Sequence, residues 1–168
     1  HSGFYSVKRI TSDPEGWSID FENAGITTTS THSSVLLALP AFRLADLEIH
    51  CQNKRVDLSL LGQIEYPPVT SVVLGFRSQD ISHPLDGFGV LIPEVEKFNS
   101  LGSVFSSSLF PGRCPVGQLT FTSYIGGARS PELALKEKDE IVRLVMEDLR
   151  VLVGLSGKPT YTHCFCWP

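Results

Sequence analysis

The pattern of hydrophobic and polar positions is most regular between residues 87 and 126, where three short segments alternate with a period of two. Side chains at i and i+2 share one face of a β-strand. The alternation therefore predicts three strands, each with one large apolar face. That face is predicted to form the core side of a sheet, and its members are Phe88, Val90 and Ile92, then Phe105 beside Ser103, then Leu119, Phe121 and Ile125.

The opposite face of the same three strands consists mainly of Gly, Ser and Thr. Its only large side chains are Leu91, Val104 and Tyr124, and charge is almost absent from it. One interpretation is that the glycines mark β-bulges and that the three exposed apolar groups have no special meaning. The other is that a floor of small residues with three bulky projections binds a flat, apolar ligand.

The first part of the chain predicts short elements. Residues 4–10 and 17–21 read as a hairpin, because the Pro and Gly between them favour a turn. Residues 34–39 predict a short apolar strand, and Pro40 suits the first turn of a helix that reaches about residue 48. A second short helix is expected over residues 56–64.

The second part predicts a sheet and a long helix. Residues 69–77 read as a strand that is apolar on both faces and therefore central. A helix is expected to begin at Ser130 and to end near Gly154, before a returning strand over residues 159–167. The apolar stripe of that helix, which is predicted to pack on the core face of the sheet, comprises Ile141, Leu144, Val145, Leu149 and Leu152. The fold class is α+β, with an antiparallel β-meander covered by one long helix and preceded by a small β-hairpin portion.

Composition and charge narrow the classes of function. The 168 residues are 42% hydrophobic, enough for one sizeable core. The chain begins on a strand-like segment without Met and ends on Trp167 and Pro168, which predicts a piece of a larger protein. A net charge of −4 without any Lys/Arg cluster argues against nucleic acid as a partner. No apolar run approaches the roughly 18 residues that a membrane-spanning helix needs.

The cysteines and histidines leave two interpretations open. Cys51, Cys114, Cys164 and Cys166 have no regular spacing, which is typical of free thiols in a reducing compartment. Together with His163, the pair Cys164 and Cys166 offers ligands for zinc, which would make the chain a zinc-stabilised interaction domain. The alternative is that both cysteines are small apolar groups on a buried strand.

Motifs for self-sufficient catalysis are missing from the sequence. There is no GxSxG, HExxH, Walker or GxGxxG pattern. His83 and Asp86 offer an acid and a base, but their spacing in a turn also suits hydrogen bonds that fix the start of a strand. We therefore predict no catalytic residue within the chain.

Four motifs carry a resemblance to a known family. The sequence resembles the oxygen-dependent protoporphyrinogen oxidases, flavoproteins of the flavin-containing amine oxidase superfamily, in HPLDGFGVLIP at residues 83–93, LGSVFSS at 101–107, FPGR at 110–113 and GGAR at 126–129. Shorter matches extend from residues 6–10 to Trp167, so the resemblance covers nearly the whole chain.

The resemblance implies a function for the glycine-rich face. In this family FAD oxidises a tetrapyrrole porphyrinogen in three two-electron steps, and oxygen reoxidises the flavin. Leu91, Val104 and Tyr124 match the family residues that hold the macrocycle. Val7 matches a residue whose backbone meets the adenine of FAD, and Trp167 matches a tryptophan near the flavin. Residues 1–64 then correspond to part of an FAD-binding domain and residues 65–168 to part of a substrate-binding domain.

The resemblance also implies what the chain lacks. The amino-terminal dinucleotide motif, the helical membrane-docking insertion, the carboxylate-binding arginine and the final flavin motif of the family all lie outside it, in the remainder of the parent polypeptide. The chain alone is therefore expected to be inactive, and the parent to be a cytoplasmic or organellar protein attached peripherally to a membrane. The alternative function is a non-enzymatic module that binds porphyrin or another flat lipophilic ligand.

Overall fold

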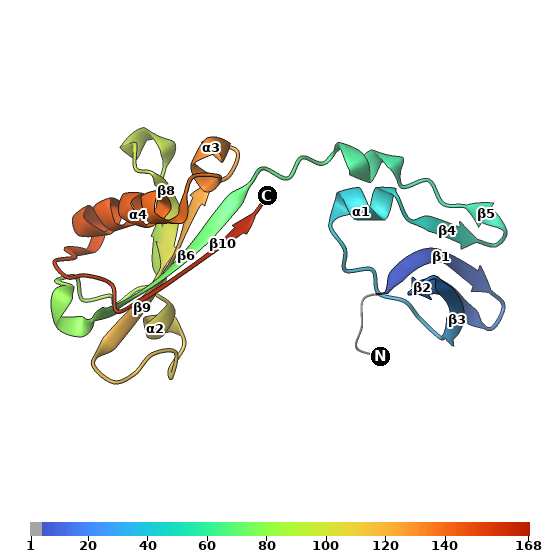
Figure 1. Cartoon of the computed structure of the whole chain (residues 1–168), viewed down its shortest axis with the longest axis horizontal. Helices are drawn as coiled ribbons and strands as arrows, with labels where there is room; N and C mark the ends of the chain where they lie inside the picture. The colour runs from blue at the N-terminus through green and yellow to red at the C-terminus, as the bar shows by residue number, and fades with distance from the viewer. Residues whose placement is uncertain (1–4) are drawn as a thin grey trace. The chain divides into compact units, whose positions relative to one another are not determined.

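The computed structural model describes residues 5–168, which form two compact units (Figure 1). The first unit extends to Glu65, and the second comprises Tyr66–Pro168. Each unit is built on its own five-stranded sheet.

The sheet of the first unit has the strand order β3-β2-β1-β4-β5. Its strands are β1 (Ser6–Asp13), β2 (Gly16–Asn23), β3 (Ile26–His32), β4 (Glu48–Cys51) and β5 (Lys54–Arg55). The predicted hairpin corresponds to β1 and β2, while Phe4 lies outside the described residues. The sequence did not indicate β3, because its run of Thr and Ser residues shows no alternation and is exposed along most of its length.

Three predictions for the first unit are wrong in detail. Residues 34–39 form no strand, and Leu36 is 91% exposed. The helix after Pro40 is α1 (Ala41–Ala45), which buries none of its residues and gives way to β4. The helix expected over residues 56–64 is only the 3₁₀ turn η1 (Ser59–Gln63). Short helices depend on packing for their stability, and these segments lack a buried face.

The sheet of the second unit has the strand order β10-β6-β9-β8-β7, and all neighbours are antiparallel. Its strands are β6 (Val69–Arg77), β7 (Gly89–Leu91), β8 (Ser100–Val104), β9 (Gln118–Gly126) and β10 (Tyr161–Trp167). Strands β7, β8 and β9 form the meander, and α4 (Lys138–Val153) covers one face of the sheet (Figure 1). The predicted α+β fold is confirmed.

Short helical turns connect these strands. They are η2 (Ser78–Asp80), η3 (Glu94–Glu96), α2 (Ser106–Leu109) and α3 (Pro131–Ala134). The helix expected to begin at Ser130 is in fact divided into α3 and α4 by residues 135–137. Gly154 ends α4 in the left-handed conformation, with φ of +64°, which glycine adopts without a steric penalty.

The core of the second unit lies between α4 and the sheet. The stripe of Ile141, Leu144, Val145 and Leu149 is buried there, and the sheet contributes Val72, Leu74, Phe76, Phe105, Phe121 and Ile125. Phe105 and Phe121 meet edge to face with their ring centroids 5.7 Å apart. This arrangement leaves the other face of the sheet, which we call the outer face, pointing away from α4.

Phe88 does not join this core, contrary to the alternation. Its side chain is 79% exposed. The reason is Gly89, whose φ of +147° interrupts the regular pleat just before β7. A Cβ atom on Gly89 would lie 2.3 Å from the carbonyl oxygen of Ser103, so only glycine fits there.

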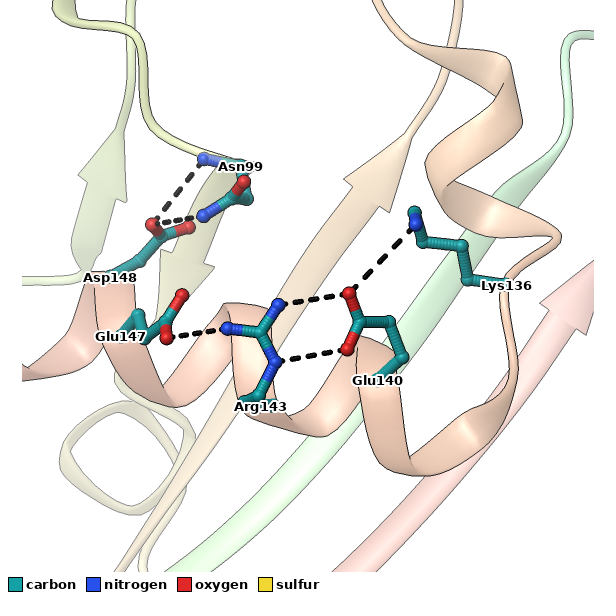
Figure 2. A network of polar contacts seen from close by, with 6 residues as sticks. All are labelled: Asn99, Lys136, Glu140, Arg143, Glu147 and Asp148. Carbon is teal, nitrogen blue, oxygen red and sulfur yellow. Dashed lines mark hydrogen bonds and ion pairs between the residues drawn. The ribbon is translucent and has the colours of Figure 1, made fainter.

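Helix α4 carries two kinds of polar contact (Figure 2). On its exposed side Arg143 bridges Glu140 and Glu147, with its shortest contact, 2.6 Å, to Glu147. Toward the sheet the carboxylate of Asp148 accepts hydrogen bonds from Asn99. The first network is solvated, whereas Asp148 is only 4% exposed and ties the helix to the start of β8.

Candidate functional site

The pairing of the strands brings the three predicted residues onto the outer face. Leu91 lies opposite Gly102, and Gly102 lies opposite Tyr124, so these residues form one row across β7, β8 and β9. Val104 lies in the adjacent row, opposite Thr122. Since Leu91, Val104 and Tyr124 come from three different strands, the sheet itself fixes their spacing.

These side chains line one cavity of about 580 Å³. Leu91 is 89% exposed and Tyr124 39% exposed, although both are large and apolar in most of their surface. Phe88 and Leu101 also line the cavity, and the alternation assigned neither of them to it. Exposed apolar groups gathered in this way on one surface are typical of a binding site.

A bulge explains the position of Leu101. The register between β8 and β9 shifts between Ser100 and Gly102, so Leu101 is an extra residue in its strand. A bulged residue disturbs the two-residue period. The bulge is therefore why Leu101 as well as Gly102 contributes to the cavity, a feature that no pattern of apolar residues signals.

Gly102 forms the floor between Leu91 and Tyr124. A Cβ atom at Gly102 would lie 2.5 Å from the carbonyl oxygen of Val90 and 3.3 Å from the Cα atom of Leu91. Contacts of 2.5 Å force a backbone to move. Glycine therefore allows β7 to approach β8 closely while it keeps the floor of the cavity free of side chains.

The cavity is poor in chemically active groups. Its other lining residues are Val69, Gly89, Val90, Gly102 and Ser103, and no Asp, Glu, Lys, Arg or His of residues 5–168 lines it. Besides backbone groups, the only polar groups of the described residues that line the cavity are the hydroxyls of Tyr124 and Ser103. The arrangement can therefore hold and orient an apolar plate, but redox chemistry requires another agent.

The two residues predicted to contact FAD belong to different units. Val7 lies on β1 and is 41% exposed. Strand β4 pairs with β1 only from Arg9 to Thr11, so no described strand pairs with Val7 on that side. An open strand edge fits the backbone contact with adenine that the resemblance implies.

Trp167 lies at the end of β10. It is 62% exposed, and its ring centroid lies 4.5 Å from that of Phe165. An exposed indole supported by a second aromatic ring fits a position beside an isoalloxazine ring. Both residues therefore remain compatible with the cofactor contacts expected of them.

The three residues proposed as zinc ligands, His163, Cys164 and Cys166, do not lie on the same face of β10. Cys164 lies opposite Val72 and Cys166 opposite Thr70, on the core side of β10, whereas His163 lies opposite Val73 on the outer face. Burial raises the pKa of the Cys164 thiol. Within residues 5–168 no three His, Cys, Asp or Glu side chains are grouped as metal ligands would be. The zinc hypothesis is therefore wrong, because its ligands point to opposite faces.

His83 has a local role in the turn before β7. Its Nδ1 atom accepts a hydrogen bond of 2.9 Å from the backbone N–H of Leu85. Leu85 is buried and has a positive φ of 53°. The contact fixes this unusual backbone conformation, which agrees with the turn-fixing interpretation of His83.

Comparison with known proteins identifies the family. A model described as flavin containing amine oxidoreductase matches residues 5–168. The chain belongs to this family. Its predicted character as a flavoprotein of the amine oxidase superfamily is thereby confirmed, and the family's cofactor is a flavin.

Individual members of the flavin-containing family add detail. The chain is 32% identical to protoporphyrinogen oxidase 2 of Arabidopsis thaliana, named chloroplastic/mitochondrial, over 91% of the chain and 31% of that protein. It is 32% identical to a mitochondrial protoporphyrinogen oxidase of Nicotiana tabacum, over 80% of the chain and 27% of that protein. The chain thus spans less than a third of the length of these relatives. The resemblance inferred from the motifs is confirmed.

A solved structure supports the fold. A crystal structure from Exiguobacterium sp. 255-15, provisionally named a protoporphyrinogen oxidase, superposes with a TM-score of 0.68 at 15% identity. The match covers 96% of this chain and 34% of that one. Among the helices of residues 5–168, none has the length and apolar character needed to cross a membrane.

Proposed function

We propose that the second unit of this chain is the substrate-binding part of an FAD-dependent oxidase that converts protoporphyrinogen IX into protoporphyrin IX with oxygen. The observation that carries the proposal is the cavity formed by Leu91, Val104 and Tyr124 over the glycine floor at Gly102. The first unit then contributes part of the FAD-binding domain. The names of the relatives from Arabidopsis and tobacco support the same assignment.

The cavity matches the shape and polarity of a tetrapyrrole. A porphyrinogen is a large ring whose body is mostly hydrocarbon, and it gains free energy when it leaves water. Burial of a tyrosine-sized surface of about 150 Å² contributes at most about 4 kcal/mol, with smaller shares from Leu91 and Val104. Association itself costs several kcal/mol, so tight binding requires further contacts from the rest of the protein.

The chain contributes orientation rather than redox chemistry. FAD, when bound, takes up the hydride equivalents that leave the substrate. Leu91 and Tyr124 project from the floor at Gly102, where they position the ring and exclude water from its faces. Val7 and Trp167 would contact the adenine and the flavin. Residues 5–168 by themselves are then catalytically silent, because they contain no dinucleotide motif.

The test is the truncation of Tyr124 in the complete flavin-loaded protein. Tyr124→Ala is expected to raise KM for protoporphyrinogen about tenfold and to leave the flavin content unchanged, because the lost apolar contact is worth at least about 1.4 kcal/mol. Val151→Ala is the matched control, since Val151 is 74% exposed on α4, which covers the other face of the sheet.

The outcomes separate the proposal from its alternative. Unaltered KM in Tyr124→Ala would contradict the role of this cavity in substrate binding. A wild-type protein that binds protoporphyrin but never oxidises the porphyrinogen would support the non-enzymatic binding module instead. Loss of flavin in Tyr124→Ala would show that the residue contributes to the cofactor site or to folding.

A further inference from the structure

A second cavity lies beside the first on the outer face of the same sheet. It has a volume of about 600 Å³ and shares Val104 and Tyr124 with the first cavity as lining residues. Its walls differ in polarity, because they include Thr120, Thr122 and Arg113. A ligand that rests on Tyr124 can therefore extend from an apolar region into a polar one.

Arg113 gives the second cavity its charge. No Asp or Glu lines this cavity, and Arg113 is the only charged residue that does. Arg113 forms no hydrogen bond or ion pair with any residue between 5 and 168; the guanidinium carbon instead lies 5.3 Å from the ring centroid of Phe110. A cation–π contact of this kind orients the guanidinium but leaves its five N–H donors unused.

Several other polar groups of the cavity already have partners. The hydroxyls of Ser106 and Thr122 are 2.8 Å apart, and the side-chain oxygen of Gln118 accepts a hydrogen bond of 2.9 Å from Thr160. The loop that carries Arg113 is closed by the thiol of Cys114, which donates to the backbone oxygen of Gln118 at 3.0 Å. The guanidinium is thus the one charged group that lines this cavity, and it has no acceptor among residues 5–168.

We propose that Arg113 binds a carboxylate of the substrate while the apolar body of the substrate occupies the cavity at Leu91, Val104 and Tyr124. This inference rests on the proposed function, because porphyrinogens carry acidic side chains at the edge of an apolar ring. A planar guanidinium matches a carboxylate with two parallel hydrogen bonds. Arg113 would then select acidic macrocycles against neutral ones and fix the orientation of the ring on Tyr124.

The experiment compares one ligand with and without its charges. Protoporphyrin IX and its dimethyl ester are titrated into the complete flavin-loaded protein, and binding is followed by porphyrin fluorescence. Arg113→Gln is expected to weaken binding of the diacid about three- to tenfold and to leave binding of the diester unchanged. Arg113→Lys should fall between wild type and Arg113→Gln, because it keeps the charge but loses the planar fork.

A control variant and salt dependence sharpen the test. Arg150→Gln removes the same charge from an exposed position on α4, which covers the other face of the sheet, and should leave both ligands bound as in wild type. Rising ionic strength should weaken binding of the diacid to wild type more than to Arg113→Gln. Equal affinity of wild type and Arg113→Gln for the diacid would overturn the inference.

Failure of this inference is distinguishable from failure of the proposed function. Arg113→Gln could bind the diacid as tightly as wild type while Tyr124→Ala binds neither the diacid nor the diester. In that case the cavity binds porphyrin and Arg113 plays no part. If the wild-type protein binds neither ligand, the proposed function itself fails. If Arg113→Gln weakens the diacid and the diester equally, its effect is on the structure of the loop, which also overturns the role assigned to Arg113.

Discussion

The carboxylate of Asp148 on α4 accepts two hydrogen bonds from Ser100, 2.7 Å from the backbone nitrogen and 2.6 Å from the hydroxyl. Asn99 donates two more, from its backbone and its side chain, to the other carboxylate oxygen (Figure 2). A buried carboxylate with four donors links the long helix to the first residue of β8. The same strand carries Val104 and the bulged Leu101, so this contact positions one wall of the cavity.

Replacement of Asp148 by Asn should therefore loosen β8. The amide keeps the shape of the carboxylate but presents N–H groups to one pair of donors, which leaves buried donors without an acceptor. The free energy of opening at β8 should fall by about 1–3 kcal/mol. Hydrogen exchange of the backbone amides of β8 and α4 measures this locally, which suits a chain with two separate units.

The neighbouring residue provides the control for Asp148→Asn. Glu147 is exposed on the same helix and pairs with Arg143 at the surface (Figure 2). Glu147→Gln should change exchange at β8 far less, because solvated ion pairs contribute little to stability. Equal protection of β8 in Asp148→Asn and in wild type would mean that the buried carboxylate does not hold the strand.

The surface network of α4 should have a measurable pH signature. The hydrogen bonds from Arg143 lower the pKa of Glu140 from its ordinary value of 4.5. A depressed pKa contributes stability above the unfolded-state pKa, and this contribution disappears as the pH falls through the folded-state pKa. Carbon NMR titration of the Glu140 carboxyl should show its pKa rising toward 4.5 in Arg143→Gln. An unchanged pKa in that variant would show that the contact does not persist in solution.

The cysteines should differ in reactivity according to their burial. The Cys164 side chain is partly buried against the core, and loss of hydration raises the pKa of its thiol. Cys51 and Cys166 are exposed. At pH 8 iodoacetamide should therefore alkylate Cys51 faster than Cys164, as measured by mass spectrometry of the digested protein, because the thiolate is the reactive form. In guanidinium the two rates should converge. Equal rates in the folded protein would contradict the placement of Cys164.

The period of apolar residues in the sequence predicted the buried and exposed faces correctly wherever the strands and the helix are regular. The stripe of α4 and the alternation of β9 predicted both the core and the outer face that carries Tyr124. The prediction failed at Phe88 and missed Leu101, because a positive φ at Gly89 and a bulge in β8 break the two-residue period. Phe88 and Leu101 both line the cavity. The order of apolar and polar residues indicates neither of these two deviations from the regular period.

Other failures of prediction arose from tertiary contacts. Asp148 was not predicted as a structural residue, since nothing local indicates that it faces four donors from another part of the chain. Residues 34–39 were predicted as a strand from their apolar character, yet no described strand pairs with them. Arg113 belongs to the FPGR motif, but the motif does not indicate the role proposed for it, because that role depends on a cavity assembled from distant strands.

The substitution Gly102→Ala is the most direct test of whether Gly102 forms the floor of the substrate cavity. The added methyl group would lie 2.5 Å from the carbonyl oxygen of Val90, so β7 must move away from β8. Because β7 carries Leu91, the displacement should change the width of the cavity and not only its depth. We expect KM for protoporphyrinogen to rise about tenfold in the flavin-loaded protein, comparable to the loss of one good apolar contact.

Gly87→Ala is the matched control for this substitution. A Cβ atom at Gly87 meets no other atom within 4 Å, and Gly87 lies outside the cavity lined by Leu91. Its KM should therefore equal that of wild type. Flavin content and hydrogen exchange at α4 should stay unchanged in both variants, since neither glycine belongs to the hydrophobic core that packs on the helix. A wild-type KM in Gly102→Ala would mean that the substrate does not rest on this floor, because the strand displacement forced by the methyl group acts directly on the position of Leu91.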